Sequence, residues 1–223
     1  MKLQSFNSFL NEGVNDPAIF KAIFLAGGPG SGKSFIVGKT GLTSMGYKVV
    51  NSDDAFENAM KKASMEMNPD NIFSVKGQEL RGKAKSLTGT KQAMYIKGRL
   101  GLVIDGTGKD PSKIADQAKE LKKLGYDVAM IFVNTDLDTA ISRDAQRART
   151  LGAKGVTEYW KAVQANIGKF QTMFGKTNFL VVDNSEGKDY QKETLRAYRD
   201  ATKFTQSPVD NSKAKKWIAG EKK

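Results

Sequence analysis

The segment from Gly27 to Ser34 combines the residue types and the spacing that phosphate binding requires. It matches the pattern G-x-x-x-x-G-K-[ST] and reads, in order, Gly27, Gly28, Pro29, Gly30, Ser31, Gly32, Lys33 and Ser34. Glycines let backbone N–H groups turn toward an anion, Lys33 would reach the β- and γ-phosphates, and Ser34 would coordinate Mg²⁺. The alternative is a glycine-rich turn that precedes Lys-Ser by chance. Because every position of the pattern is filled, we expect this loop to bind a nucleoside triphosphate.

Acidic residues that follow two β-prone runs could supply the chemistry beside that loop. Asp53 and Asp54 come directly after Tyr47 to Asn51, and Asp105 ends the run Gly101 to Asp105. The chain has no His and no Cys, so a carboxylate is the natural group to accept a proton from an attacking hydroxyl. We predict Asp53 as this base. Asp54 is expected to contact the acceptor or to cap the next helix, Ala55 to Met67, and a capping role for Asp53 is the alternative to catalysis.

Asp105 has two interpretations of its own. It could hold Mg²⁺ together with Ser34, or contact the acceptor, because ligands of parallel sheets gather at the carboxyl ends of the strands. The alternative is a turn residue at the end of a strand. We favour the role in the site.

Three arginines, Arg143, Arg147 and Arg149, lie near the end of a predicted helix, Asp136 to Arg149. Arg143 and Arg147 are four residues apart, a spacing that places both on one helical face. From there they would neutralise charge as a γ-phosphoryl group is transferred. A solvated face, or a complement to the helix dipole, is the alternative and is favoured more for Arg149.

The window Lys76 to Arg99 is strongly basic and lies in the expected acceptor-binding segment. It contains seven Lys or Arg residues and one acid, Glu79, for a net charge of +6. We predict that Arg81, Lys83 and Lys85 bind the acceptor, because a row of basic side chains can bind along the backbone of a polyanion. The alternative is a helical hairpin whose lysines face water.

Five short apolar runs alternate with helix-length segments and must position these residues. They are Ala22 to Ala26, Tyr47 to Asn51, Gly101 to Asp105, Val128 to Asn134 and Asn178 to Asp183. This alternation predicts an α/β fold: a P-loop NTPase three-layer sandwich with a five-stranded parallel sheet and a helical insertion between the second and third strands. Asp110-Pro111 predicts a helix start and Leu124-Gly125 its end.

Composition limits the remaining possibilities. The 223 residues carry 36 Lys and Arg against 24 Asp and Glu, a formal charge of +12, and 39% are hydrophobic. That is room for one full-sized domain, and the absence of Cys and His excludes disulfides and the usual zinc sites. No run approaches the roughly 18 apolar residues that span a bilayer, and we expect a cytoplasmic protein with no membrane partner. The chain also lacks the N-K-x-D of GTPases and the acidic pair of helicases, which leaves a small-substrate kinase.

Four segments together resemble the zeta-toxin and polynucleotide 5′-hydroxyl kinase branch of P-loop kinases. They are GGPGSGKS, VVNSDDAF, GLVIDGTGKDP and ISRDAQR, within roughly Lys21 to Asp183. The resemblance implies that Asp53 is the general base, that Arg143 and Arg147 are lid arginines, and that Asp105 and Thr107 belong to the site. One departure is Phe56, where such polynucleotide kinases carry an acceptor-binding Arg.

The implied activity is an ATP- and Mg²⁺-dependent transfer of the γ-phosphate to a hydroxyl-bearing acceptor. A nucleic acid or nucleotide is the favoured acceptor, and a nucleotide sugar is the alternative that the resemblance also supplies. A third hypothesis makes the chain a basic internal or DNA-associated phage protein whose kinase fold is secondary.

The two ends are expected to lie outside the kinase domain, residues 18–184. Leu3, Phe6, Phe9 and Leu10 are spaced as on a short amphipathic helix within residues 1–17. The segment also resembles the capsid-targeting peptides of large tailed phages, in which a prohead protease cuts after Leu-x-Glu, here Leu10-Asn11-Glu12. That resemblance implies a capsid or protease partner and packaging in a virion. Residues 185–223 are expected to form a helix and a loosely held basic tail.

Overall fold

The computed structural model describes residues 13–147 and 150–222. The predicted amphipathic segment from Leu3 to Leu10, the processing site Leu10-Asn11-Glu12 and the third arginine, Arg149, lie outside the described residues.

 

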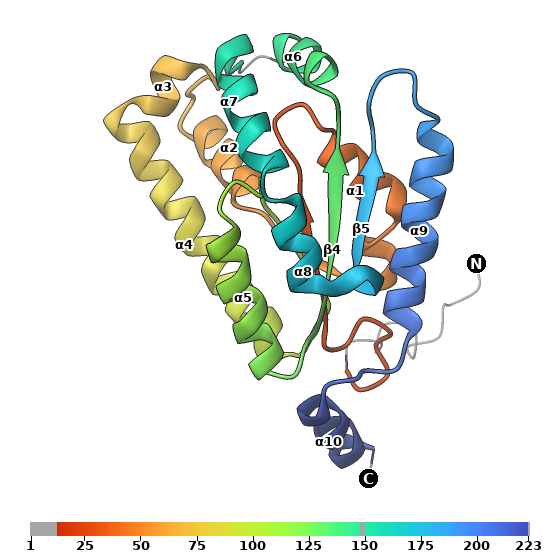
Figure 1. Cartoon of the computed structure of the whole chain (residues 1–223). Helices are drawn as coiled ribbons and strands as arrows, with labels where there is room; N and C mark the ends of the chain where they lie inside the picture. Colours follow the sequence, from red (N-terminus) through yellow and green to blue (C-terminus); the bar gives the residue numbers. More distant parts are fainter. Residues whose placement is uncertain (1–12, 148–149, 223) are drawn as a thin grey trace, which may run out of the picture.

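Five parallel strands form the central sheet, in the order β2-β3-β1-β4-β5. Their bounds are β1 Lys21–Ala26, β2 Lys48–Val50, β3 Leu102–Asp105, β4 Asp127–Asn134 and β5 Phe179–Asp183. Ala22 of β1 pairs with Leu102 of β3 on one side and with Val128 of β4 on the other. The predicted five-stranded parallel sheet is confirmed, so the carboxyl ends of all five strands lie at one edge. Figure 1 shows this direction for β4 and β5.

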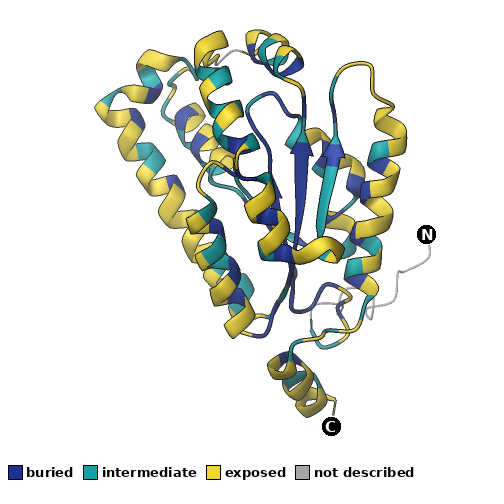
Figure 2. Ribbon diagram, viewed as in Figure 1, coloured by how far each residue is buried: buried dark blue, intermediate teal, exposed yellow. Residues whose placement is uncertain are grey.

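Helices cover both faces of this sheet and produce the three predicted layers. Alternate residues of β1 serve the two faces because successive side chains of a strand point in opposite directions. Phe24 belongs to the core beneath α5 (Pro111–Lys123) and α8 (Ile167–Asn178), whereas Ile23 and Leu25 belong to the core beneath α1 (Lys33–Thr40) and α9 (Tyr190–Gln206). Figure 2 shows the buried strands between helices whose outer surfaces are exposed.

The predicted start and end of α5 are confirmed. The Asp110 side chain caps the helix by accepting a hydrogen bond from the backbone N–H of Lys113 at 3.1 Å, and Pro111 occupies the first helical position. Gly125, with φ of 109°, follows the last turn and turns the chain into β4. A proline that needs no N–H partner and a glycine that accepts a positive φ therefore define this helix.

The insertion between β2 and β3 consists of α2 (Ser52–Lys62), α3 (Pro69–Phe73) and α4 (Val75–Lys97). It has its own small core of buried side chains: Phe56, Met60, Ile72 and Ala84. The helical insertion is as predicted. The basic window is one continuous helix of 23 residues rather than the hairpin of the alternative, but the lysines of this window are exposed, as that alternative expected. The helix expected from Ala55 to Met67 begins three residues earlier and ends at Lys62.

The end of the chain is more ordered than a loosely held tail. Residues Ser212–Glu221 form α10, and the Trp217 ring packs edge-on against Phe20 with 5.5 Å between centroids. The Asp127 carboxylate accepts hydrogen bonds from the backbone N–H groups of Asp210 and Asn211 at 2.8 and 3.2 Å. These contacts fix α10 at the end of the sheet opposite the phosphate-binding loop, where Figure 1 places it.

The remaining described elements complete the fold. They are α6 (Leu137–Ala145), α7 (Gly152–Gln164) and a short 3₁₀ helix at Thr43–Met45. Across the described part of the chain, no helix is both long enough and apolar enough to cross a bilayer.

Candidate functional site

The glycine-rich loop connects the end of β1 to the start of α1, which is the context that the sequence pattern requires. Gly30 and Gly32 have φ of 70° and 83°, a conformation that favours glycine. A Cβ at Gly30 would lie 2.5 Å from the carbonyl oxygen of Ala140, and one at Gly32 would overlap the Asn184 side chain. Glycine is therefore required at both positions by backbone conformation and by close neighbours.

Side chains from distant elements brace this loop. Asn184, directly after β5, is buried, and its Nδ2 donates to the carbonyl oxygen of Ser31 at 2.8 Å. Arg143 on α6 donates through Nη1 to the carbonyl oxygens of Asn184 at 2.9 Å and of Gly30 at 3.4 Å. The backbone N–H of Gly27 donates to the carbonyl oxygen of Thr107 at 3.2 Å. The loop is thus held by three segments that are far apart in the sequence.

Asn184 was not among the predicted site residues. The available signal was its position, because it is a polar residue that follows the last residue of a strand at the carboxyl edge of a parallel sheet. Sequence alone offers no means of knowing that its amide reaches the loop between β1 and α1.

The Lys33 ammonium lies inside the loop. Its Nζ donates to the carbonyl oxygen of Gly27 at 2.7 Å. Burial lowers the pKa of Lys33 below its ordinary value; Arg147 lowers it further, while Asp105 and Asp53 act in the opposite direction. Asp53, Asp105 and Arg147 are therefore close enough to Lys33 to act on its charge.

Asn51 connects the carboxyl ends of β2 and β3. Its Nδ2 donates to Asp105 Oδ2 at 3.0 Å, and its Oδ1 accepts from the backbone N–H of Asp53 at 2.8 Å. Asn51 is therefore the N-cap of α2, and the prediction that Asp53 or Asp54 caps this helix is wrong. The Asn51 amide thus caps the helix and also binds Asp105. The carboxylates of Asp53 and Asp54, which are exposed in the first turn of α2, therefore have no capping role.

Asp105 has the properties expected of a cation ligand. Its Oδ1 is buried and has no hydrogen-bond partner within residues 13–147 and 150–222. Burial raises the pKa of Asp105 above its ordinary value; the charge of Lys33 opposes this, and Asp53 and Asp54 add to it. A carboxylate whose Oδ1 has no partner in the described part of the chain fits Mg²⁺, which binds proteins through one or two oxygen ligands and otherwise through phosphates and water. Ser34 is exposed and belongs to the loop that follows β1, the strand that pairs with β3. No group of three acidic side chains suited to a metal occurs among the described residues.

Arg143 and Arg147 do not share a helical face. The helix ends at Ala145 rather than at Arg149, so Arg147 lies beyond its last turn. The backbone turns there, with the N–H of Arg147 donating to the carbonyl oxygen of Asp144 at 3.0 Å. Arg143 donates hydrogen bonds to the carbonyl oxygens of Gly30 and Asn184. The side chain of Arg147 is exposed, and its charge lowers the pKa of Lys33. The structure thus gives the two arginines different surroundings.

Thr107 lies on the exposed turn after β3. Its backbone oxygen contacts the phosphate-binding loop, and its Oγ1 accepts a hydrogen bond from the backbone N–H of Lys109 at 3.3 Å. Thr107 is therefore at the carboxyl edge of the sheet, with its backbone against the loop.

The basic residues predicted to bind the acceptor do not form one stripe. Lys83 is exposed and pairs with Glu79 at 2.6 Å, and Lys85 is exposed as well. Arg81 is half-buried and stacks on Phe56 of α2, with Cζ 4.7 Å from the ring centroid. Lys97 lies about 24 Å farther along α4 than Arg81, at 1.5 Å per residue. The basic window therefore spreads over different faces and ends of one helix.

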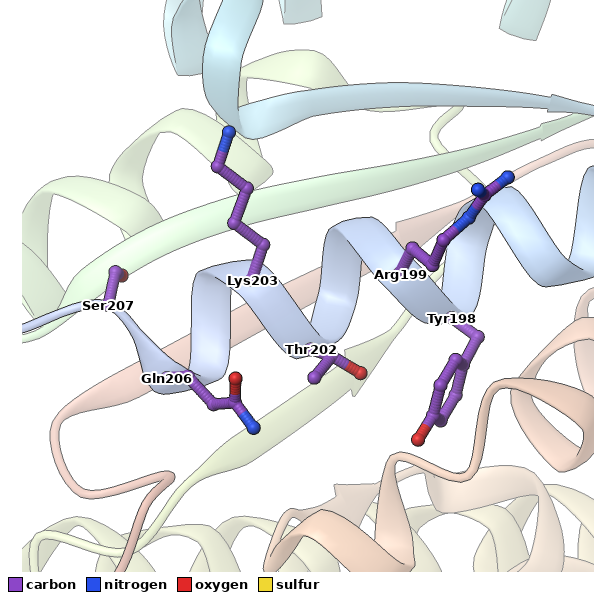
Figure 3. Close-up of a pocket in the computed structure, with 6 residues that line it drawn as sticks. All are labelled: Tyr198, Arg199, Thr202, Lys203, Gln206 and Ser207. Carbon is purple, nitrogen blue, oxygen red and sulfur yellow. The ribbon is translucent and has the colours of Figure 1, made fainter.

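A hollow of about 410 Å³ lies elsewhere, along the C-terminal half of α9 (Figure 3). Its lining residues are Tyr198, Arg199, Thr202, Lys203, Gln206 and Ser207. Figure 3 shows Arg199 and Lys203 pointing to one side of the helix and Tyr198 to the other, so the polar groups do not converge on one point. None of the residues described above for the phosphate-binding loop takes part in it.

The sequence model of one protein family matches this chain from residue 14 to residue 193, which is most of its length. The chain belongs to the zeta toxin family. This confirms the family part of the resemblance stated from the four sequence segments. None of the curated proteins matches the sequence.

Solved structures share the fold of this zeta toxin family member. The AvrRxo1-ORF1:-ORF2 complex with ATP matches with a TM-score of 0.56 at 14% identity, over 96% of this chain and 87% of that one. A protein assigned as a kinase from Chloroflexus aurantiacus matches with a TM-score of 0.54 at 14% identity, over 81% and 97%. The Pnkp1/Rnl/Hen1 RNA repair complex matches with a TM-score of 0.52 at 19% identity, over 67% of this chain and 46% of that one. At these identities the likeness shows the fold, which is that of P-loop kinases.

Replacing Asn184 with alanine is expected to weaken nucleotide binding and to destabilise this family member. The substitution removes the donor to Ser31, and a lost hydrogen bond to a buried group costs about 1–3 kcal/mol. We expect a lower melting temperature and a dissociation constant for a non-hydrolysable ATP analogue that rises roughly 5- to 100-fold. Calorimetric titration measures the second effect. Asn58→Ala, at an exposed position of α2, is the matched control, and equal affinities of the two variants would contradict a bracing role for Asn184.

Proposed function

We propose that this protein is an ATP- and Mg²⁺-dependent phosphotransferase that moves the γ-phosphate of ATP to a hydroxyl group of an acceptor. One observation carries the proposal: Asn51 hydrogen-bonds both Asp105 Oδ2, at 3.0 Å, and the backbone N–H of Asp53, at 2.8 Å, and both acidic residues raise the pKa of Lys33 in the phosphate-binding loop. Binding of a nucleotide with Mg²⁺ would use Asp105 alone and would not need Asp53 as a second carboxylate beside the loop. Transfer to a hydroxyl needs such a carboxylate as a base.

The proposed roles follow from the surroundings of each group. The loop amides and Lys33 hold the β- and γ-phosphates, and Lys33 exchanges its hydrogen bond with the Gly27 oxygen for one with phosphate. Ser34 and Asp105 would hold Mg²⁺, which neutralises charge on the phosphates when it is bound. Arg143 fixes the loop, and the exposed Arg147 offers its guanidinium to the transferring group.

The proton of the attacking hydroxyl goes to Asp53. Its carboxylate is exposed in the first turn of α2, at the acceptor side of the loop, and the Asn51 cap keeps the backbone of that turn in place. The hydroxyl oxygen forms the new bond to phosphorus as the bond to the β-phosphate oxygen breaks, and ADP leaves. Asp54 and Thr107, both exposed at the same edge, are proposed to contact the acceptor.

A nucleic acid or nucleotide is the acceptor that we favour. The formal charge of +12 and the net charge of +6 between Lys76 and Arg99 suit a polyanion, with Lys83 and Lys85 available at the surface of α4. The structural likeness to a protein of an RNA repair complex is consistent with this choice. A nucleotide sugar, the other acceptor implied by the family resemblance, is the alternative.

Transfer of label from γ-labelled ATP tests this function directly. The protein is incubated with Mg²⁺ and, in parallel, with 5′-hydroxyl oligonucleotides, mononucleotides and nucleotide sugars, and Lys33→Met serves as the inactive control. Label on an oligonucleotide or mononucleotide supports the favoured acceptor, and label on a nucleotide sugar moves the assignment to the alternative. Intact ATP binding with label on no acceptor would contradict the proposed activity.

A second candidate function is that of a basic phage internal protein that acts in the host cytoplasm after delivery from a virion. The observation that favours it is the sequence Leu10-Asn11-Glu12, which fits the Leu-x-Glu that a prohead protease cuts. We expect the mature protein recovered from virions to begin at Gly13. Mass spectrometry of the intact protein measures this, and a chain that retains Met1 in virions would contradict processing.

A further inference from the structure

Lysines from two helices gather at the end of the sheet opposite the phosphate-binding loop. All are exposed, and we call them the α5–α10 basic surface: Lys119, Lys122 and Lys123 of α5, and Lys213 and Lys216 of α10. All but Lys216 line one hollow of about 570 Å³, together with Ala115, Ala118 and Met173. Lys216 comes three residues after Lys213 and is therefore its neighbour on one face of α10.

Hydrogen bonds join the two helices and fix this surface relative to the sheet. Lys213 Nζ donates to the carbonyl oxygen of Lys123 at 2.7 Å, and Asn211 Nδ2 donates to that of Lys122 at 2.7 Å. Figure 1 shows α10 at the end of the molecule where α5 ends and β4 begins. Because β4 has eight residues, its two ends are roughly 23 Å apart, and the surface lies far from the phosphate-binding loop.

Little in the fold compensates the charge of this surface. Glu120 pairs with Lys123 at 2.6 Å, but none of the ion pairs within residues 13–147 and 150–222 involves Lys119, Lys122 or Lys216. With Glu120 included, the net charge is +4. Lys122 and Lys123 complement the dipole at the end of α5, whereas Lys213 lies in the first turn of α10, where a positive charge opposes the dipole. A bound polyanion would relieve both this opposition and the repulsion among the lysines.

We propose that the α5–α10 basic surface binds the phosphate backbone of duplex nucleic acid without regard to its sequence. A duplex carries about one negative charge per 1.7 Å of its axis, so lysines spread over two helices can each meet a phosphate. The ammonium group of lysine contacts phosphates as a point charge, and such contacts carry no information on sequence. This surface is remote from the proposed catalytic site, and the inference does not rest on the proposed activity.

The residue types of the hollow favour a duplex over other polyanionic partners. Among the described residues that line it, none is an arginine or an aromatic residue. Those types anchor most protein–protein interfaces, and aromatic rings stack on the bases of single strands. The apolar residues of the hollow, Ala115, Ala118 and Met173, are buried or half-buried, so they would not insert into a bilayer as the apolar face of a membrane-binding helix does. What remains for contact is charge alone, which suits a phosphate backbone.

Binding of a duplex whose 5′ ends already carry phosphates tests the proposal. A fluorescent duplex of about 20 base pairs is titrated with the full-length protein between about 50 and 200 mM salt, and anisotropy gives the dissociation constant. Lys119→Gln, Lys122→Gln and Lys213→Gln, combined in one variant, should raise this constant roughly tenfold or more. The slope of the logarithm of affinity against that of salt concentration should fall by about 3, one for each lysine. Arginine in place of lysine at the same three positions should keep the binding.

The matched control removes the same charge from exposed positions elsewhere, by Lys61→Gln and Lys62→Gln on α2 with Lys192→Gln on α9. It should bind the duplex as the unsubstituted protein does, and melting curves show that each variant is folded. Equal weakening in this control, or an unchanged affinity in the first variant, overturns the surface. Binding to polyglutamate or to phosphatidylserine vesicles in place of the duplex overturns nucleic acid as its occupant. Duplex binding that depends on the three lysines supports the surface whether or not the protein transfers label to an acceptor.

Discussion

Lys33→Ala is expected to abolish phosphoryl transfer, with a loss of roughly 10²- to 10³-fold or more in turnover. Lys33 Nζ lies inside the loop, 2.7 Å from the Gly27 oxygen, so no other ammonium group of the loop can take its place against the phosphates. The measurement is single-turnover transfer from γ-labelled ATP to whichever acceptor is labelled by the unsubstituted protein. Unchanged activity in this variant would exclude the loop as the phosphate site.

A second variant guards against an effect on folding. Lys33→Met keeps the length of the side chain, and because burial already lowers the pKa of Lys33, removal of its charge should not reduce the free energy of unfolding. Lys39→Ala is the matched control, since Lys39 lies in the last turn of the same helix and is exposed. We expect Lys33→Met to be folded and inactive, and Lys39→Ala to be folded and active.

Asp53→Asn is expected to bind nucleotide normally and to lose transfer by about 10²- to 10⁴-fold, the usual contribution of a general base. The amide cannot accept the proton of the acceptor hydroxyl, while the Asn51 cap, which bonds the backbone of residue 53, is left in place. The two measurements are calorimetric titration with a non-hydrolysable ATP analogue and single-turnover transfer.

Asp54→Asn is the matched control for this substitution. It removes the same charge from the same exposed first turn of α2, where a negative charge contributes about 0.3–1 kcal/mol to helix stability. Effects of the charge on stability and on nucleotide binding should therefore be alike in the two variants, and the loss of transfer should be far larger in Asp53→Asn. The reverse result would assign the base to Asp54.

Much of the fold and part of the site could be predicted from the sequence because the signals are local. The phosphate-binding loop is a continuous segment whose glycines, lysine and hydroxyl are fixed by spacing alone. The strands were recognisable as short apolar runs, and Pro111 and Gly125 are residues whose backbone preferences define the ends of a helix. Asp53 and Asp105 follow strands directly, so a parallel sheet brings them to one edge.

Other features depended on contacts that no local pattern contains. The end of α6 at Ala145 removed the shared face predicted for Arg143 and Arg147, and Arg143 proved to bind carbonyl oxygens of Gly30 and Asn184. The capping role assigned to Asp54 belongs to Asn51, whose amide also reaches Asp105 on the neighbouring strand. These errors share one cause. The hydrogen-bond partners of these polar side chains are distant in the sequence and come within reach only in the folded chain.

The sequence by itself determined the phosphate-binding loop, the parallel sheet that carries it and the family to which the chain belongs. All three follow from residue types at fixed spacings along the chain, and the loop and the sheet are found in the structure where the sequence predicts them. Only the tertiary structure decided how far each basic residue of α4 is removed from water. Arg81, Lys83 and Lys85 carry the same charge, but the packing of α4 against α2 places the half-buried Arg81 over the Phe56 ring and leaves both lysines exposed. The free energy of a charged side chain depends strongly on its exposure to water, and tertiary packing sets that exposure.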